Sequence, residues 1–202
     1  MSWWNKSTAI PTDKAFSDVV RKFVFECPSS TRKGKNSVGK YGKKKKKQVV
    51  YPVSARGVSF RSRGVTGHYL LTILAQIRRP LVANEAYHVV DNSVDIENKV
   101  KQIISGSSLS DPEFDLMVFQ KRDSNQMPET EAIYYYIRNA FAHGSFEVKN
   151  TTSGRCYYLE SSKEGNIKAQ MRLKETTLQE YIRLSELEPA AIKQYQKPKK
   201  RK

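Results

Sequence analysis

The sequence is poor in cysteine and histidine. Two cysteines in 202 residues, Cys27 and Cys156, are too few for a disulfide framework, and no CxxC pair indicates a metal site. Three histidines make a zinc centre a poor expectation. No apolar run approaches the ~18 residues that a membrane helix needs, and the first residues lack the apolar stretch of a signal peptide. We therefore expect a cytoplasmic protein with no metal, no cofactor and no membrane contact.

Acidic residues are missing from two short stretches that hold most of the positive charge. The chain has 36 Lys and Arg against 20 Asp and Glu, a formal net charge of +16. Residues 32–47 contain nine basic residues and residues 197–202 contain five, with no acid in either stretch. Runs of like charge repel themselves and act as solvated arms for polyanions. The rest of the chain is nearly neutral, so we expect a folded body with two basic arms and with nucleic acid as the partner.

The spacing of apolar residues predicts a mainly α fold. Spacings of three and four residues predict helices over residues 13–26, 68–78, 80–104, 112–120, 128–143 and 177–188. After Gly144 the spacing falls to about two, which predicts two or three antiparallel strands before the last helix. Residues 29–48 are expected to form a flexible basic linker, followed by a short strand at 49–53 and a loop at 55–67. The expected architecture is a helical bundle with a small β-meander.

This pattern also predicts how the chain is divided. We expect an N-terminal helical segment, a basic linker and loop region, a main domain and a basic tail, which occupy residues 1–28, 29–67, 68–188 and 189–202. The basic residues 197–202 have the composition of an RNA-binding tail and equally that of a solubilising tail, and PKKRK (198–202) also has the composition of a nuclear localisation signal.

The most informative stretch is Arg138-Asn139-Ala140-Phe141-Ala142-His143, at the end of a predicted helix. Asn139 and His143 are four residues apart and share a helix face, and Arg138 lies one step from Asn139. A guanidinium binds phosphate through two N–H groups, and an imidazole both takes and gives protons near neutral pH. Arg138, Asn139 and His143 together predict chemistry on a phosphodiester.

This stretch resembles the RNxxxH signature of the HEPN superfamily, many of whose members are metal-independent ribonucleases. The resemblance covers about residues 68–186 and is strongest to bacterial and plasmid-borne toxins and phage-defence nucleases. This prokaryotic character of the domain argues against a nuclear localisation signal at residues 198–202. It implies a homodimer in which two copies of the motif share one cleft, and an antitoxin or regulatory partner. It also implies that RNA is cleaved through the 2′-OH, with His143 as general acid or base, Arg138 stabilising the phosphorane and Asn139 holding the imidazole or the phosphate.

Further residues are candidates for RNA contacts. They are Arg56, Arg61 and Arg63 beside the folded region, Lys43, Lys44, Lys45, Lys46 and Lys47 in the densest basic run, and Tyr134 as a stacking platform. Three successive tyrosines from Tyr134 to Tyr136 cannot share one helix face, so at least one belongs to the core. His143 could also simply end its helix, and Arg138 could form a surface ion pair. A non-catalytic RNA-binding or partner-docking module therefore remains the alternative.

Overall fold

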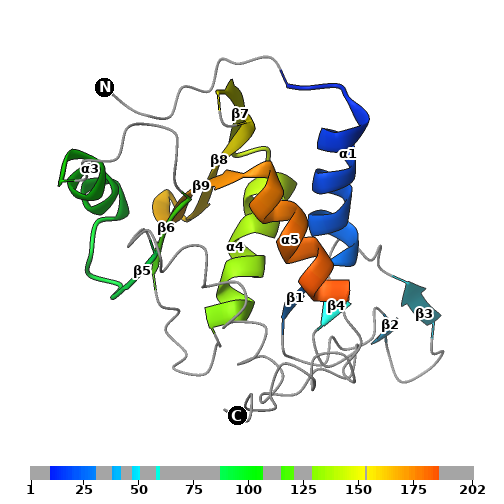
Figure 1. Ribbon diagram of the computed structural model, residues 1–202. Coiled ribbons are helices and arrows are strands. Elements are labelled where there is room, and N and C mark those ends of the chain that lie inside the picture. Colours follow the sequence, from blue (N-terminus) through cyan, green and yellow to red (C-terminus); the bar gives the residue numbers. More distant parts are fainter. Residues whose placement is uncertain are drawn as a thin grey trace, which may run out of the picture.

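The computed structural model of the chain describes residues 10–30, 38–41, 47–50, 58–59, 87–106, 115–120, 129–152 and 154–186. The elements before the main sheet are α1 (Lys14–Arg21), the π-helix η1 (Lys22–Glu26), β1 (Pro28–Ser30), β2 (Val38–Tyr41), β3 (Lys47–Val50) and β4 (Val58–Ser59). They are followed by β5 (Tyr87–Val90), α3 (Ile96–Gly106), β6 (Leu116–Gln120), α4 (Glu129–Ala142), β7 (Phe146–Thr151), β8 (Gly154–Lys163), β9 (Asn166–Lys174) and α5 (Glu175–Glu186), as Figure 1 shows.

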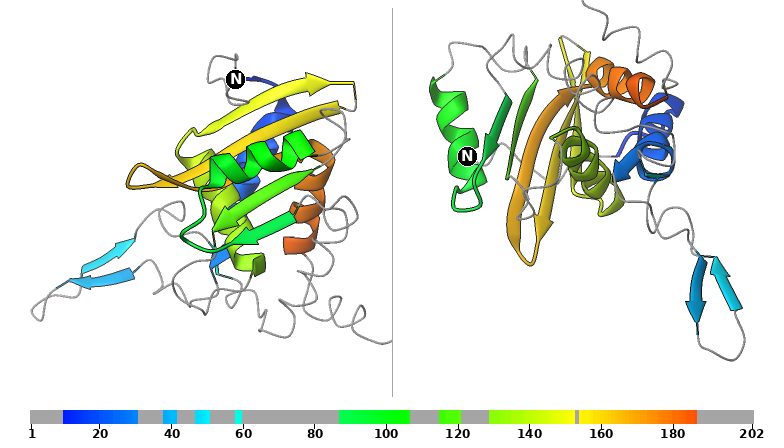
Figure 2. Two further views of the ribbon diagram at one scale, coloured as in Figure 1. Left: turned by 90° about the vertical axis from the view of Figure 1, so that its left-hand side faces the viewer. Right: turned by 90° about the horizontal axis from the view of Figure 1, so that it is seen from below.

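A five-stranded mixed sheet forms the centre of the fold. Its strand order is β5-β6-β9-β8-β7, in which β5 and β6 are parallel and every other pair is antiparallel. Helices α4, α1 and α5 lie on one side of the sheet and α3 lies on the other, as Figure 2 shows. The protein is therefore an α/β protein, and the predicted mainly α bundle is wrong.

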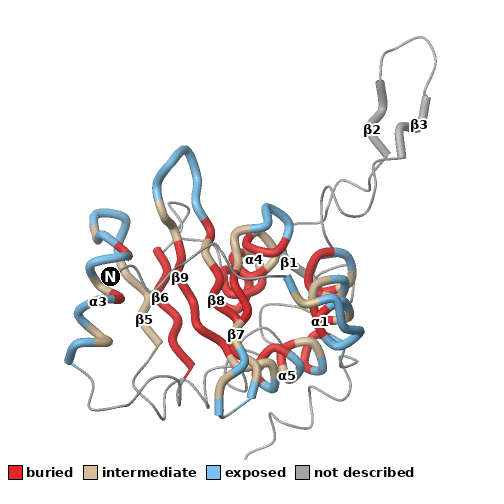
Figure 3. The backbone as a smooth tube through the Cα atoms, turned by 90° about the horizontal axis from the view of Figure 1, so that it is seen from above, coloured by how far each residue is buried: buried red, intermediate tan, exposed pale blue. Residues whose placement is uncertain are grey.

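Strand β6 is buried on both faces, which explains why its sequence was mistaken for a helix. Met117 and Phe119 belong to the core between the sheet and α4, whereas Leu116 and Val118 pack beneath α3. All five residues of the strand are buried, as the red segment in Figure 3 shows. A strand covered on both faces has a continuous apolar run. Such a run cannot be told from a buried helix by periodicity, so the helix predicted at 112–120 is wrong.

From residue 87 onward, a strand, a turn and a shorter helix replace the long helix predicted over residues 80–104, and residues 80–86 lie outside the described part of the chain. Tyr87–Val90 pair in parallel with β6. A turn follows, in which Val94 N donates to Asp91 O at 3.1 Å, and Asp95 then caps α3 by accepting from Asn98 N at 3.1 Å. Adjacent valines in the sequence favour a strand, and Asp and Asn residues favour turns and helix caps. These residue preferences agree with the observed structure, whereas the three- and four-residue spacing of apolar residues does not.

The predicted basic linker contains regular backbone pairing. Strands β2 and β3 form an antiparallel hairpin, which projects from the body in Figure 2, and β1 pairs in parallel with β4. The flexible basic linker expected over residues 29–48 therefore includes paired strands that were not predicted. The start of β3 precedes the predicted strand at 49–53, and the helix predicted at 68–78 lies outside the described residues.

The first predicted helix and the predicted elements after Gly144 are found in the structure. Asp13 is the N-cap of α1, and its carboxylate accepts from Phe16 N at 3.0 Å. The three antiparallel strands β7, β8 and β9 follow α4 in the predicted order. Helix α5, the last predicted helix, then buries Leu178, Tyr181 and Leu184.

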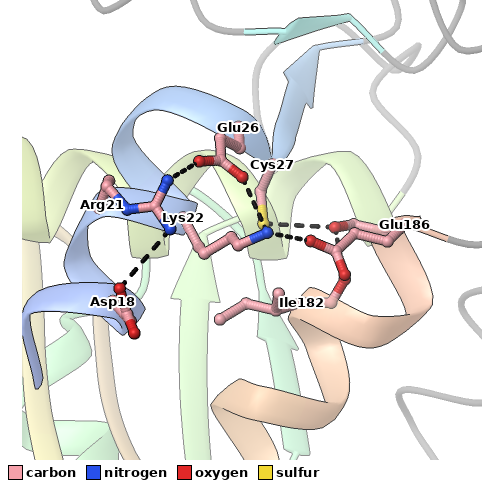
Figure 4. A network of polar contacts seen from close by, with 8 residues as sticks. Asp18, Arg21, Lys22, Glu26, Cys27, Ile182 and Glu186 are labelled. Atoms are coloured by element: carbon pink, nitrogen blue, oxygen red, sulfur yellow. Dashed lines mark hydrogen bonds and ion pairs between the residues drawn. The ribbon is translucent and has the colours of Figure 1, made fainter. Parts of the chain in front are cut away.

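Helix α1 and η1 pack into the same core as the later elements. Phe23 of η1 contacts the rings of Tyr134 and Phe141 on α4. At the surface, Lys22 pairs with Glu26 and Glu186, which joins η1 to the end of α5, as Figure 4 shows. The two carboxylates raise the pKa of the Lys22 ammonium.

Candidate functional site

The site residues on α4 are fixed by the way the helix ends. Gly144 has a φ of 67°, which favours glycine because a side chain is strained there. Gly144 N donates to Phe141 O at 3.2 Å, and Ser145 N donates to Ala140 O at 2.9 Å. This is the Schellman pattern of a helix C-terminus. It confirms the predicted end of the helix and leaves His143 exposed on the last turn.

His143 and Asn139 line one wall of a cavity of about 250 Å³. Tyr135 and Tyr136, from the same helix, complete that wall. The other lining residues come from the β8–β9 hairpin and from the chain at the ends of β5 and β6: Asn92, Gln120, Ser161, Ser162, Lys163 and Lys168. Elements far apart in the sequence therefore converge at the ends of parallel strands, which is where α/β sheets usually bind ligands.

The cavity has the composition of an anion-binding site. Two lysines and a histidine line it together with amides and hydroxyls, and none of its described lining residues is acidic. Lys168 is half-buried, whereas Lys163 is exposed and lies 3.6 Å from the exposed carboxylate of Glu164. Ammonium, amide and hydroxyl groups are donors for phosphate oxygens. Lys168 is thus the better placed of the two cations.

A β-bulge directs Lys168 toward the cavity. Ser161 pairs with Ala169 and Ser162 pairs with Ile167, so Lys168 is an extra residue in β9 with no opposite partner on β8. Bulges turn a side chain away from the regular alternation and are frequent beside active sites. Because of the bulge, Ile167 packs with the residues under α3 although Ala169, two residues further on, packs in the core beside α4, and Lys168 between them lines the cavity.

Arg138 does not line this cavity. It is half-buried on the adjacent face of α4, near Tyr135, and burial lowers the pKa of its guanidinium. The helical spacing thus brings Asn139 and His143 together, as predicted, and leaves Arg138 outside the site. Lys168, Gln120 and the serines of β8 were not predicted from the sequence. They could be found only from the register of β8, β9 and β6.

The tyrosine chosen as a stacking platform lies in the core. Tyr134 is 0% exposed and its hydroxyl donates to Tyr181 O, so the prediction that it stacks on a base is wrong. Tyr136 is also buried, whereas Tyr135 is half-exposed and lines the cavity. The expectation that at least one of the three belongs to the core is confirmed.

The other predicted RNA contacts cannot be placed in the site. Arg56, Arg61, Arg63 and Lys43 to Lys46 lie outside the described residues. Lys47 begins β3, opposite Tyr41 in the hairpin.

No known protein family, no curated protein and no solved structure matches the chain. Within the described segments, no helix is long and apolar enough to cross a bilayer. In the same segments, no group of three or more His, Cys, Asp or Glu side chains is arranged to hold a metal ion.

Proposed function

We propose that the protein binds RNA and cleaves it through the 2′-OH at the cavity that His143 and Lys168 line. The observation that carries this proposal is the lining itself, in which an imidazole, two ammonium groups and three amides line one space with no described carboxylate among them. A phosphodiester is an anion whose cleavage needs proton transfer and charge stabilisation. The side chains of this cavity supply both.

The reaction is a transesterification within the RNA. His143 takes the proton of the 2′-OH as the 2′-oxygen attacks phosphorus. The bond from phosphorus to the 5′-oxygen breaks, and water protonates that oxygen, which leaves a 2′,3′-cyclic phosphate and a 5′-OH. The ammonium of Lys168 stabilises the extra negative charge of the phosphorane. Asn139, one turn before His143, holds the imidazole or a phosphate oxygen.

This assignment differs from the one that the RNxxxH resemblance implied. Lys168 takes the charge-stabilising role in place of Arg138, because Arg138 does not line the cavity. The two-copy cleft of the superfamily belongs to helical bundles, and the α/β fold gives it no support, so the proposal concerns the cavity of a single chain. A role as a toxin or phage-defence effector rests on the resemblance alone. The basic stretches at 32–47 and 197–202 would raise the local RNA concentration.

A second candidate function is RNA binding without cleavage. It is favoured by the presence of a single imidazole in the described lining, because acid and base roles in such cleavage are commonly divided between two groups.

Incubation of single-stranded RNA with the protein in EDTA tests the proposal. We expect cleavage to products that end in a 2′,3′-cyclic phosphate, and no cleavage of the same sequence carrying 2′-O-methyl groups. Binding of both oligonucleotides without cleavage of either would favour the second candidate. Cleavage of the 2′-O-methyl RNA would rule out the 2′-OH mechanism, and a failure to bind either would reject both functions.

A further inference from the structure

Gln120 is a buried amide that contacts three walls of the candidate site. It is the last residue of β6 and is 6% exposed. Its Nε2 donates to Asn92 O at 3.2 Å and to Val94 O at 3.0 Å, and its Oε1 accepts from Lys168 Nζ at 2.8 Å. Its backbone oxygen accepts from the hydroxyl of Tyr136 at 3.0 Å. One residue thus joins the turn after β5, the bulge of β9 and helix α4.

The two carbonyl acceptors determine how the amide is oriented. A side-chain amide has two N–H donors on one side and an oxygen on the other. Because Asn92 and Val94 both offer carbonyl oxygens, the NH₂ group must face them and the oxygen must face Lys168. Lys168 therefore meets a fixed acceptor. The ammonium has three N–H groups, so two remain for a ligand after the bond to Gln120.

A second cavity of about 360 Å³ lies on the other side of this contact. It is formed by the turn and first residues of α3 and by the β8–β9 turn, and it shares Asn92, Gln120 and Lys168 with the His143 cavity. Gln120 and Lys168 are thus part of the wall between two adjoining spaces. A lysine that moved freely would distribute its charge over both. The bond to Gln120 limits that freedom.

We propose that Gln120 is a positioning residue that holds the Lys168 ammonium at the His143 cavity, ready to bind a phosphate oxygen. This inference rests on the proposed function, in which that cavity binds a phosphodiester. Gln120 acts through Lys168 and takes no part in proton transfer. A long lysine side chain loses rotamer freedom when it binds a phosphate, and holding it in advance removes part of that loss.

The ligand-free protein provides the first test. Side-chain NMR relaxation at the Cε of each lysine reports how far its end is ordered. We expect Lys168 to be more ordered than the exposed Lys163 in the wild type, and to become as mobile as Lys163 in Gln120→Met, which keeps the length and loses the hydrogen bonds. Gln170→Met is the matched control. Gln170 is 1% exposed, bonds to Glu160 Oε2 at 3.1 Å and lines neither cavity, so its loss should leave Lys168 ordered.

A double-mutant cycle on affinity provides the second test. We expect Gln120→Met to weaken binding of a short 2′-O-methyl RNA about tenfold, near the effect of a lost hydrogen bond to a charged group. In a Lys168→Met background the same change should have almost no further effect, because Gln120 then has nothing to position. Gln170→Met should leave the affinity unchanged in both backgrounds.

The outcomes separate this inference from the proposed function. Equal order of Lys168 in the wild type and in Gln120→Met would overturn the positioning role, and so would additive losses of affinity in the two variants. If the wild type binds the oligonucleotide and cuts no RNA, cleavage is rejected while the cycle still tests Gln120. If the wild type binds no oligonucleotide, the proposed function fails and the relaxation result alone decides whether Gln120 fixes Lys168.

Discussion

Tyr134 and Tyr135 are adjacent in the chain, and their side chains lie on different sides of α4. The hydroxyl of Tyr134 donates to the carbonyl oxygen of Tyr181 in the core, whereas Tyr135 lines the cavity that contains His143. A helix turns by about 100° per residue, so adjacent side chains meet different environments. Only one of these two rings can contact a ligand.

Substitution of the two tyrosines should therefore have separate effects. Tyr134→Phe removes a buried hydroxyl and leaves the Tyr181 carbonyl without that donor, so we expect the free energy of unfolding to fall by about 1–2 kcal/mol. RNA affinity should be unchanged. Tyr135→Ala should weaken RNA binding while the unfolding free energy changes less than in Tyr134→Phe. Urea denaturation and fluorescence anisotropy measure the two quantities. An equal loss of RNA affinity in both variants would contradict the assignment of Tyr134 to the core and of Tyr135 to the cavity.

The two lysines of the cavity should differ in their contribution to RNA binding. Lys168 is half-buried and held by Gln120, whereas Lys163 is exposed and lies beside Glu164. We expect Lys168→Met to weaken RNA binding about tenfold and to lower the slope of log affinity against log salt by about 1. Lys163→Met, the matched control, should have a smaller effect on affinity because its ammonium is solvated and already paired. A larger effect at Lys163 would mean that the phosphate lies beside the turn of the β8–β9 hairpin.

Gly144→Ala should destabilise the protein through its backbone. No atom lies within 4 Å of the position of an added Cβ, but the φ of 67° is unfavourable for alanine. We expect a loss of about 1 kcal/mol, with lower cleavage activity because His143 precedes this residue. Gly106→Ala is the control: it also has open space around the added Cβ, without a left-handed φ. It should leave the midpoint of thermal unfolding nearly unchanged, and equal losses in both variants would contradict the role of the Gly144 backbone.

Asp115 should make stability decrease as the pH rises through the acidic range. Its carboxylate accepts from Lys174 N at 2.8 Å and from Thr177 Oγ1 at 2.6 Å, and burial raises its pKa. Between the ordinary carboxyl pKa and this raised value, the folded protein binds more protons than the unfolded chain, so the free energy of unfolding falls with rising pH. Asp115→Asn should remove that dependence, which urea denaturation at several pH values would show.

Asp13 provides a contrast of opposite sign. Its side-chain hydrogen bonds to Arg155, at 3.0 and 2.8 Å, lower the pKa of its carboxyl. The stability that this carboxylate contributes is therefore present above the ordinary carboxyl pKa and is lost as the pH falls through the lowered value. Asp13→Asn should lose stability mainly at neutral pH. If Asp115→Asn shows the same pH profile as Asp13→Asn, the assignment of Asp115 is wrong.

The sequence predicted the local structure best where a boundary signal accompanied the spacing. The start of the first helix near residue 13, the end of α4 before Gly144 and the antiparallel strands β7–β9 are all confirmed by the structure. It failed at β6, which is buried on both faces and so shows no period of its own, and at β5, a half-buried strand of four residues at the edge of the sheet. Because both strands were predicted as parts of helices, the fold was predicted to be a helical bundle and not an α/β fold.

The candidate site was predictable only in the part that lies on one helix. Asn139 and His143 share a face because they are four residues apart, and that relation can be calculated from the sequence. Lys168 and Gln120 reach the same cavity through a bulge in β9 and through the end of β6. Neither relation can be known before the strand register is known. Arg138 is adjacent to Asn139 in the motif, but it does not line the cavity.

The role of His143 is tested by single-turnover cleavage of single-stranded RNA in EDTA with the wild type, His143→Ala and His88→Ala. His88 lies on β5 and does not line the His143 cavity, so it controls for the loss of an imidazole elsewhere in the sheet. We predict that His143→Ala lowers the cleavage rate by about 10²- to 10⁴-fold, with RNA affinity nearly unchanged, and that His88→Ala cleaves like the wild type. Undiminished cleavage by His143→Ala would contradict the central claim.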